Sequence, residues 1–213
     1  MGTIEALALA MGTAWTSGIN LYATVAALGI ANLAQLIQLP PDLQVLSHPA
    51  VIGIACTMYM IEFFADKVPY VDSGWDVLHT FIRVPAGAIL AARSLGDMNP
   101  ALELAALLAG GSIALAAHGL KATTRLAINA SPEPFSNWAA SVTEDIAVFG
   151  SLWMIFHHPI VMMLLVVGFI ALMVWLVPKI FRLAKRGFQA LRNKWTGVKP
   201  DQPAPSGSSP QPT

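Results

Sequence analysis

Charged side chains are scarce in this chain of 213 residues. Asp, Glu, Lys and Arg together make up 11% of the residues, while apolar residues make up 55% and the mean hydropathy is +0.61. A typical soluble domain has roughly a quarter of its residues charged. The composition therefore predicts an integral membrane protein, whose main partner is the lipid bilayer, and gives no sign of a nucleic-acid partner, which would require a basic surface.

Cysteine and the common catalytic motifs are also scarce. Cys56 is the single cysteine, so the chain can form neither a disulfide framework nor a cysteine-based zinc site. The motifs His-Glu-x-x-His and Gly-x-Ser-x-Gly are absent, as are the Walker and dinucleotide-binding motifs, and we predict no cofactor. The first ten residues lack a basic segment and include Glu5, so we expect no secretory signal peptide there.

The few charges are distributed unevenly along the chain. Residues 1–178 hold eleven Asp and Glu against five Lys and Arg, whereas residues 179–213 hold seven Lys and Arg against one Asp. Basic residues next to a span favour the cytoplasmic side of the membrane. We therefore expect a cytoplasmic C-terminus and, with six spans, a cytoplasmic N-terminus as well.

The basic region divides into two parts. Residues 179–197 are predicted to form a basic amphipathic segment on the membrane surface, because such segments bind anionic headgroups. The residues expected to contact those headgroups are Lys179, Arg182, Lys185 and Arg186. Residues 198–213 are rich in Pro and Ser and are predicted to be a disordered tail.

The first apolar run covers residues 3–39 and ends at two prolines. A membrane-spanning helix needs about 20 residues, so this run is too long for one straight span and too short for two. We expect it to break near Gly12 and residues 16–18, just before the polar residues Asn20 and Thr24. A re-entrant segment and a long tilted helix both agree with this pattern.

Five further apolar runs follow within residues 1–178, so the predicted fold class is an all-α, polytopic transmembrane helical bundle of about six spans. The fourth run, residues 100–129, is again overlong and contains Gly110, Gly111 and Gly119. Dividing the chain near Pro100 leaves three spans on each side, each set starting with a run that glycines break. An odd number of spans in each half predicts a 3+3 inverted repeat, as in many transporters.

The ionisable residues of these spans follow helical spacing. Asp72, Asp76, His79 and Arg83 step by four, three and four residues and so share one helix face. Similar spacings form three more groups: Glu62 with Asp66; His118 with Lys121 and Arg125; Asn137 with Ser141 and Glu144, next to Asp145. Three striped helices can all hide their stripes from lipid only if the stripes face one another. We therefore predict one shared polar site, with Arg83 close to Glu144.

Two blocks of sequence resemble a known family. They are ADKVPYVDSGWDVLHTFIRVPAGAIL, which begins at Ala65, and HGLKATTRLAINASPEPFSNWAASVTEDIAVFG, which begins at His118. Together they resemble the bacterial membrane proteins called domain of unknown function 4126, over roughly residues 3–178. The resemblance implies a bacterial membrane location and marks the polar blocks as hallmarks of the family. It implies no particular activity.

Three classes of function agree with these observations. Ionisable groups at bilayer depth cost around 2.5–3.5 kcal/mol each, so they usually mark a site or pathway. The favoured class is a small secondary transporter or channel of the bacterial inner membrane that moves an ion or small polar solute. Its predicted pathway residues are Asn20, Glu62, Asp66, Asp72, Asp76, His79, Arg83, His118, Lys121, Arg125, Asn137, Glu144 and Asp145.

Two alternatives remain open at the level of sequence. Asp72 and Asp76 could hold Mg²⁺ in a membrane-embedded enzyme, with Arg83 and Lys121 on a lipid phosphate. The protein could instead be a non-catalytic assembly protein, in which the same charges neutralise one another and hold the helices in register.

Overall fold

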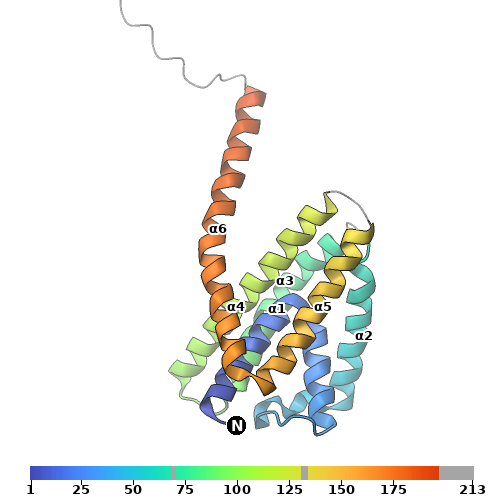
Figure 1. Ribbon diagram of the computed structural model, residues 1–213, viewed down its shortest axis with the longest axis vertical. Coiled ribbons are helices and arrows are strands. Elements are labelled where there is room, and N and C mark those ends of the chain that lie inside the picture. Colours follow the sequence, from blue (N-terminus) through green and yellow to red (C-terminus); the bar gives the residue numbers. More distant parts are fainter. Residues whose placement is uncertain (69–70, 131–133, 197–213) are drawn as a thin grey trace, which may run out of the picture. The chain divides into compact units, whose positions relative to one another are not determined.

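The computed structural model describes residues 1–68, 71–130 and 134–196, and every regular element in these ranges is helical. The elements are α1 (Thr3–Leu33), the 3-10 helix η1 (Pro41–Ser47), α2 (Pro49–Ala65), α3 (Val71–Ser94), α4 (Pro100–Asn129), α5 (Pro134–His157) and α6 (Pro159–Thr196) (Figure 1). They form two compact units, Met1–Ile170 and Ala171–Thr213. The all-α prediction is confirmed for the described residues.

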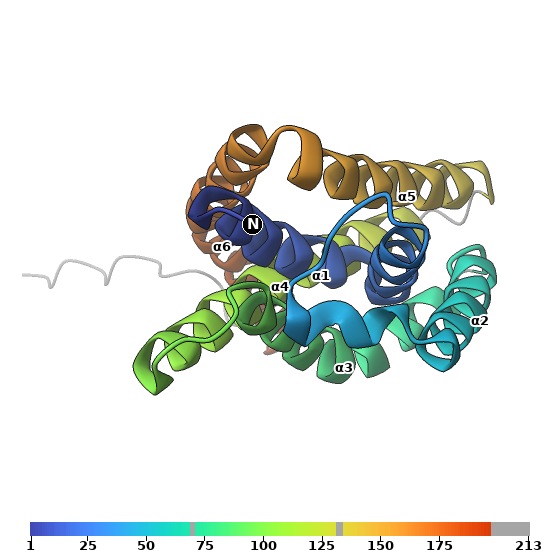
Figure 2. The same cartoon turned by 90° about the horizontal axis from the view of Figure 1, so that it is seen from below.

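Helix α1 lies inside the first unit, between α5 on one side and the α3–α4 pair on the other (Figure 2). Its buried residues include Thr13, Thr16 and Ser17. Their hydroxyls donate hydrogen bonds to carbonyl oxygens of the preceding turn of the same helix. These small side chains satisfy their own polar groups and let the neighbouring helices come close.

The backbone of α1 breaks at Asn20, where φ is −147° and ψ is 97°. The Oδ1 atom of Asn20 accepts a hydrogen bond from the N–H of Ala23 at 2.9 Å, so Asn20 caps the second half of the helix. The hydroxyl of Thr24 donates to the Asn20 carbonyl at 2.8 Å. The break lies two residues beyond the predicted cluster at 16–18, because Asn20 provides the capping group.

The two halves of α1 run in opposite directions (Figure 1). Gly12, in the first half, faces Ile155 and Met162 on either side of the α5–α6 turn, and Gly29, in the second half, faces Leu46 beside the η1–α2 turn. Both turns lie at the same end of the first unit as the N-terminus. Of the two alternatives for this run, α1 therefore has the form of a re-entrant segment.

Several glycines are packing positions. A Cβ atom at Gly18 of α1 would clash with the carbonyl oxygen of Ala114 in α4, and one at Gly110 of α4 would clash with the Cβ of Ala91 in α3. Helix α4 continues without a break through all three of its glycines. The predicted interruption of the fourth run is wrong. Gly110 permits a close contact between α4 and α3, and Gly119, at which an added Cβ would have nothing within 4 Å, lies within the continuous helix. The inverted repeat relied on matching breaks in the two halves, and it is not confirmed.

Three helical segments of the described chain are long and apolar enough to cross a membrane: Pro100–Asn129, Phe135–His157 and Pro159–Arg182. Elements η1 and α2 meet at 65° and make a fourth if the bent pair is counted as one span. These segments indicate a membrane protein. The predicted number of six spans is not confirmed by this count.

The second unit contains the later part of α6. That helix continues to Thr196 without a break through the exposed basic residues Lys179, Arg182, Lys185 and Arg186. The Lys179 ammonium lies 3.3 Å from the centre of the Trp175 ring. The predicted boundary at residue 178 is a change in composition within one helix, and the predicted tail at 198–213 lies outside the described residues.

Candidate functional site

The charged stripes of α2, α3, α4 and α5 meet in one buried group of side chains, here named the charge cluster. It contains five carboxylates and three cations: Glu62, Asp66, Asp72, Asp76, Glu144, Arg83, Lys121 and Arg125. Seven of the eight residues are at most 5% exposed, and the side chain of Glu144 is 17% exposed. The four stripes predicted from spacing therefore share one site.

The opposite face of α3 is apolar and open. Val77, Leu78 and Phe81 are 65%, 66% and 79% exposed, whereas Asp76 and Arg83 on the same helix are buried. Such an inside-out distribution is expected of a helix that faces lipid on one side and a polar interior on the other. Helix α3 therefore carries its charges on the inner face of the first unit and apolar side chains on the outer face.

Arg83 joins α3 to α2. Its Nη2 atom lies 2.6 Å from Oε1 of Glu62, and its Nη1 atom lies 3.1 Å from Oδ1 of Asp76. Nη1 also lies 3.1 Å from Nδ1 of His118 in α4. The predicted pairing of Arg83 with Glu144 is wrong, because Arg83 meets the acids of α2 and α3 at this level of the bundle.

Lys121 of α4 bridges acids from two other helices. Its ammonium lies 3.2 Å from Oε1 of Glu62, 3.2 Å from Oδ2 of Asp66 and 3.3 Å from Oε2 of Glu144. One carboxylate is enough to balance the charge of one ammonium group, and Lys121 has three nearby. Lys121 can therefore shift between carboxylates without losing an ion pair.

Arg125 takes the position that was predicted for Arg83. Its Nε and Nη2 atoms donate to the two carboxylate oxygens of Glu144 at 2.9 and 2.7 Å, a bidentate pair. Nη2 also reaches Oδ2 of Asp66 at 3.3 Å, and Nη1 donates to the backbone carbonyls of Asp66 and Asn137. Arg125 therefore ties α4 to α5 and to the end of α2.

The remaining acid of the cluster is held from α4. Oδ2 of Asp72 accepts a hydrogen bond from Nδ2 of Asn129 at 3.0 Å, and Oδ1 lies 4.0 Å from Nε of Arg125. Asp76, one turn later in α3, faces Arg83. Among the described residues no group of three or more His, Cys, Asp or Glu is placed to hold a metal ion.

The hydrogen bonds of both histidines fit neutral rings. A guanidinium can only donate, so Nδ1 of His118 accepts from Arg83, and Nε2 carries the proton toward the Asp76 carbonyl at 3.0 Å. His79 places Nδ1 2.8 Å from the Trp75 carbonyl and Nε2 3.1 Å from the Tyr22 hydroxyl. Nδ1 is therefore a donor, and in the neutral ring Nε2 accepts from the Tyr22 hydroxyl.

The charge cluster carries more acids than bases. Five carboxyl groups face three cations, so with all five ionised and both histidines neutral two negative charges would be left over. Oε2 of Glu62, Oδ1 of Asp66 and Oδ2 of Asp76 are buried and have no hydrogen-bond partner among the described residues. A buried carboxylate without compensation is costly. The cluster is therefore suited to hold further positive charge, as protons or as a cation.

Three predicted pathway residues occupy other positions. Asn20 caps the second half of α1 and lies two residues from Tyr22, which contacts the cluster through His79. Asp145 lies beside Tyr59 of α2. Asn137 is buried, and it supplies its backbone carbonyl to Arg125.

Tyr22, Thr80 and Asn129 were not predicted as part of the site. Asn129 follows Arg125 by four residues, so helical spacing could have added it to the stripe of α4. The hydroxyl of Thr80 lies 2.7 Å from Nε2 of His118. Tyr22 contacts the site only because α1 turns back at Asn20. No local sequence pattern predicts that contact.

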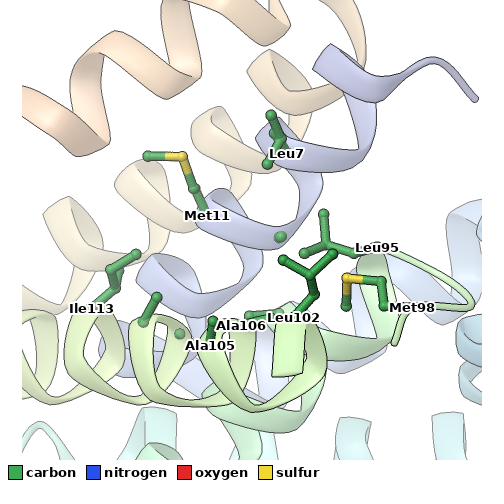
Figure 3. Close-up of a pocket in the computed structure, with 12 residues that line it drawn as sticks. Leu7, Met11, Leu95, Met98, Leu102, Ala105, Ala106 and Ile113 are labelled. Atoms are coloured by element: carbon green, nitrogen blue, oxygen red, sulfur yellow. The ribbon is translucent and has the colours of Figure 1, made fainter. Parts of the chain in front are cut away.

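A pocket of about 620 Å³ borders the charge cluster. Its walls come from α1, α4, α5 and the start of α6, and its polar lining includes Lys121 and Glu144. A second pocket, of about 260 Å³, lies between α1, α3 and α4 and is lined only by apolar side chains and glycine, including Leu7, Met11 and Leu102 (Figure 3). The second pocket offers no ionisable group and stands apart from the site.

The family described as Domain of unknown function (DUF4126) matches residues 7–179. The match covers most of the chain, so the protein belongs to this family, as the two sequence blocks suggested. Among curated proteins and solved structures, none matches the chain.

Proposed function

We propose that this member of the DUF4126 family is a small secondary transporter or channel, in which an ion or small polar solute passes through the charge cluster. The excess of buried carboxylates carries this proposal. A cluster that only fixed helix register would be most stable with its charges balanced. Two surplus negative charges, on acids with unpaired oxygens, instead favour an exchangeable positive charge.

The cations of the cluster support exchange. Lys121 lies within 3.3 Å of Glu62, Asp66 and Glu144, so loss of one acid's charge on protonation leaves it two partners. Protons or a cation can thus enter and leave with small rearrangements of Lys121. The neutral histidines next to Asp76 and Tyr22 are further groups that can take up a proton.

The two alternative functions have less support. For a Mg²⁺-dependent enzyme, Asp72 and Asp76 would have to bind the ion beside the guanidinium groups of Arg125 and Arg83, which already lie within 4.0 Å of their carboxylates. For an assembly protein, the surplus of acids has no explanation. A transporter needs no resident metal site, and the surplus of acids would serve to bind the transported ion or solute.

We also propose that the protein lies in the bacterial inner membrane with a cytoplasmic C-terminus. The exposed basic residues of α6 that follow the last apolar run support this orientation, and contact between them and anionic headgroups is part of the proposal. Six spans would place the N-terminus in the cytoplasm, whereas a re-entrant α1 places it in the periplasm. The two arrangements agree on the side of every later turn, and the reversal of α1 at Asn20 favours the second.

Ion flux through purified protein tests the proposal. Liposomes containing the protein and a fluorescent pH indicator are given a K⁺ diffusion potential with valinomycin, and then gradients of Na⁺, K⁺ or Mg²⁺. We expect proton movement faster than in empty liposomes. It should fall in Glu62→Gln and persist in Glu103→Gln, which changes a more exposed acid outside the cluster. Equal rates with and without protein under every gradient would refute the proposal.

A further inference from the structure

We propose that the pocket of about 620 Å³ beside the charge cluster binds a lipophilic organic cation, a bulky apolar molecule with one positive charge. This inference rests on the proposed function, because it names the class of solute that the site would take. The apolar wall of the pocket and the carboxylates of the charge cluster favour a cation over an anionic or zwitterionic lipid.

Most of the pocket is apolar and aromatic. Trp15 of α1, Phe135 of α5 and Phe169 of α6 line it, together with Leu120 and Ala140. Phe135 is 83% exposed and lies at its margin. Such a lining suits a large apolar body, and aromatic rings also attract a cation over their faces. Because α4 and α5 expose apolar side chains next to the pocket, a ligand dissolved in lipid can reach it from the side.

The polar lining of the pocket contains one acid, Glu144, and one cation, Lys121, besides the hydroxyl residues Thr124, Ser136 and Thr143. Glu144 is the most exposed member of the charge cluster, with 17% of its side chain accessible, whereas Lys121 is 2% exposed. The charge of Lys121 is already met by Glu62, Asp66 and Glu144. A ligand in the pocket therefore meets the carboxylate of Glu144, which is held by Arg125 and Lys121, in front of a cluster in which five carboxylates face three cations.

Charge decides which ligand fits. An anionic head would have to approach Glu144 and the surplus acids, which costs free energy through repulsion of like charges. A cation supplies the positive charge that the cluster lacks. A proton on Glu62, Asp66 or Asp76, whose buried oxygens have no hydrogen-bond partner, would supply the same positive charge. Ligand binding and proton uptake by the charge cluster should therefore compete.

Binding of two probes of matched shape tests this inference. Full-length protein in nanodiscs of zwitterionic lipid is dialysed against radiolabelled tetraphenylphosphonium, with empty nanodiscs as the blank. Tetraphenylborate has nearly the same size and the opposite charge. We expect saturable binding of the phosphonium and none of the borate above the blank.

Two variants locate the site. Glu144→Gln should weaken phosphonium binding by about tenfold or more, because a buried charge pair is lost. Ala140→Trp should do the same by filling the pocket without changing any charge. Glu103→Gln and Ala106→Trp are the matched controls, since Glu103 lies outside the charge cluster and Ala106 lines the other pocket; both should bind as the wild type does.

The outcomes separate this inference from the proposed function. Ion flux without saturable phosphonium binding would overturn the cation pocket and leave the transporter. Equal or stronger binding of the borate would also overturn it, as would unchanged binding in a folded Ala140→Trp variant. Saturable binding without ion flux in liposomes would keep the pocket and refute transport.

Discussion

Each cation of the charge cluster contacts more than one acid, and this sharing shapes the expected effect of substitutions. Removing an acid lowers a surplus of negative charge, whereas removing a cation enlarges it. Arg125, with a bidentate pair to Glu144 and a further contact to Asp66, is the clearest case. Substituting a cation of the charge cluster should therefore lower the free energy of unfolding more than substituting an acid.

Arg125→Met should destabilise the folded protein by about 3–5 kcal/mol, because it removes the bidentate partner of Glu144 and leaves Glu144 and Asp66 with Lys121 as their shared cation. Glu144→Gln alone should cost less, and the double variant should recover most of the loss of Arg125→Met. The measurement is the free energy of unfolding in mixed micelles, in a double-mutant cycle. Glu103→Gln is the control and should give no recovery. Purely additive effects in the Arg125 and Glu144 cycle would contradict the pairing.

Residue spacing was enough to predict which ionisable residues belong to the charge cluster. The steps of three and four residues grouped Asp72 with Arg83 and Lys121 with Arg125, and these groups do meet. The partners within the cluster could not be predicted, because they depend on the height and rotation of each helix. Glu144 therefore pairs with Arg125 of α4 and not with Arg83 of α3.

At the scale of the elements, the break in helix α1 determines which residues of α1 reach the charge cluster. Its break at Asn20 turns the second half back and brings Tyr22 to His79 at the charge cluster. The overlong first run predicted a break, but the same glycine signal failed for α4. A glycine in a helix either weakens it or allows a close contact, and sequence alone does not separate the two.

Gly18→Ala and Gly119→Ala are a matched pair that tests the packing of α1. A Cβ at Gly18 would meet the backbone oxygen of Ala114, which cannot move aside as a side chain can, whereas a Cβ at Gly119 would meet nothing within 4 Å. We expect Gly18→Ala to destabilise by about 1–3 kcal/mol. Gly119→Ala should be neutral or stabilise by about 0.5–1 kcal/mol. Unfolding in mixed micelles measures both, and equal stability of the two variants would contradict the close α1–α4 contact.

At the scale of the whole molecule, the reversal of α1 bears on topology. Reporters active only in the periplasm should give signal when inserted near Gln44 or Gly96 and none at the C-terminus, because the basic end of α6 favours the cytoplasm. An N-terminal reporter should also give signal if α1 is re-entrant. Activity at the C-terminus would overturn the orientation, and silence at the N-terminus with signal near Gln44 would restore six spans.

Fold class and membrane location followed from composition and apolar runs, because both depend on the sum over many residues. The inverted repeat is not confirmed, and its prediction depended on single glycines in α1 and α4. Tyr22 was missed for a related reason, since its contact arises from the tertiary path of α1 and not from local spacing.

The central claim is that the charge cluster holds more carboxylates than its own cations can balance. Infrared spectroscopy of the protein in nanodiscs measures this through the carbonyl stretch of protonated carboxylic acids. With a strongly hydrophilic organic cation, N-methyl-D-glucamine, as the only cation in the buffer, we predict that band at neutral pH. It should weaken in Glu62→Gln and remain in Glu103→Gln. If the band is absent and no inorganic cation binds, the acids are all ionised without compensation, which would contradict the account.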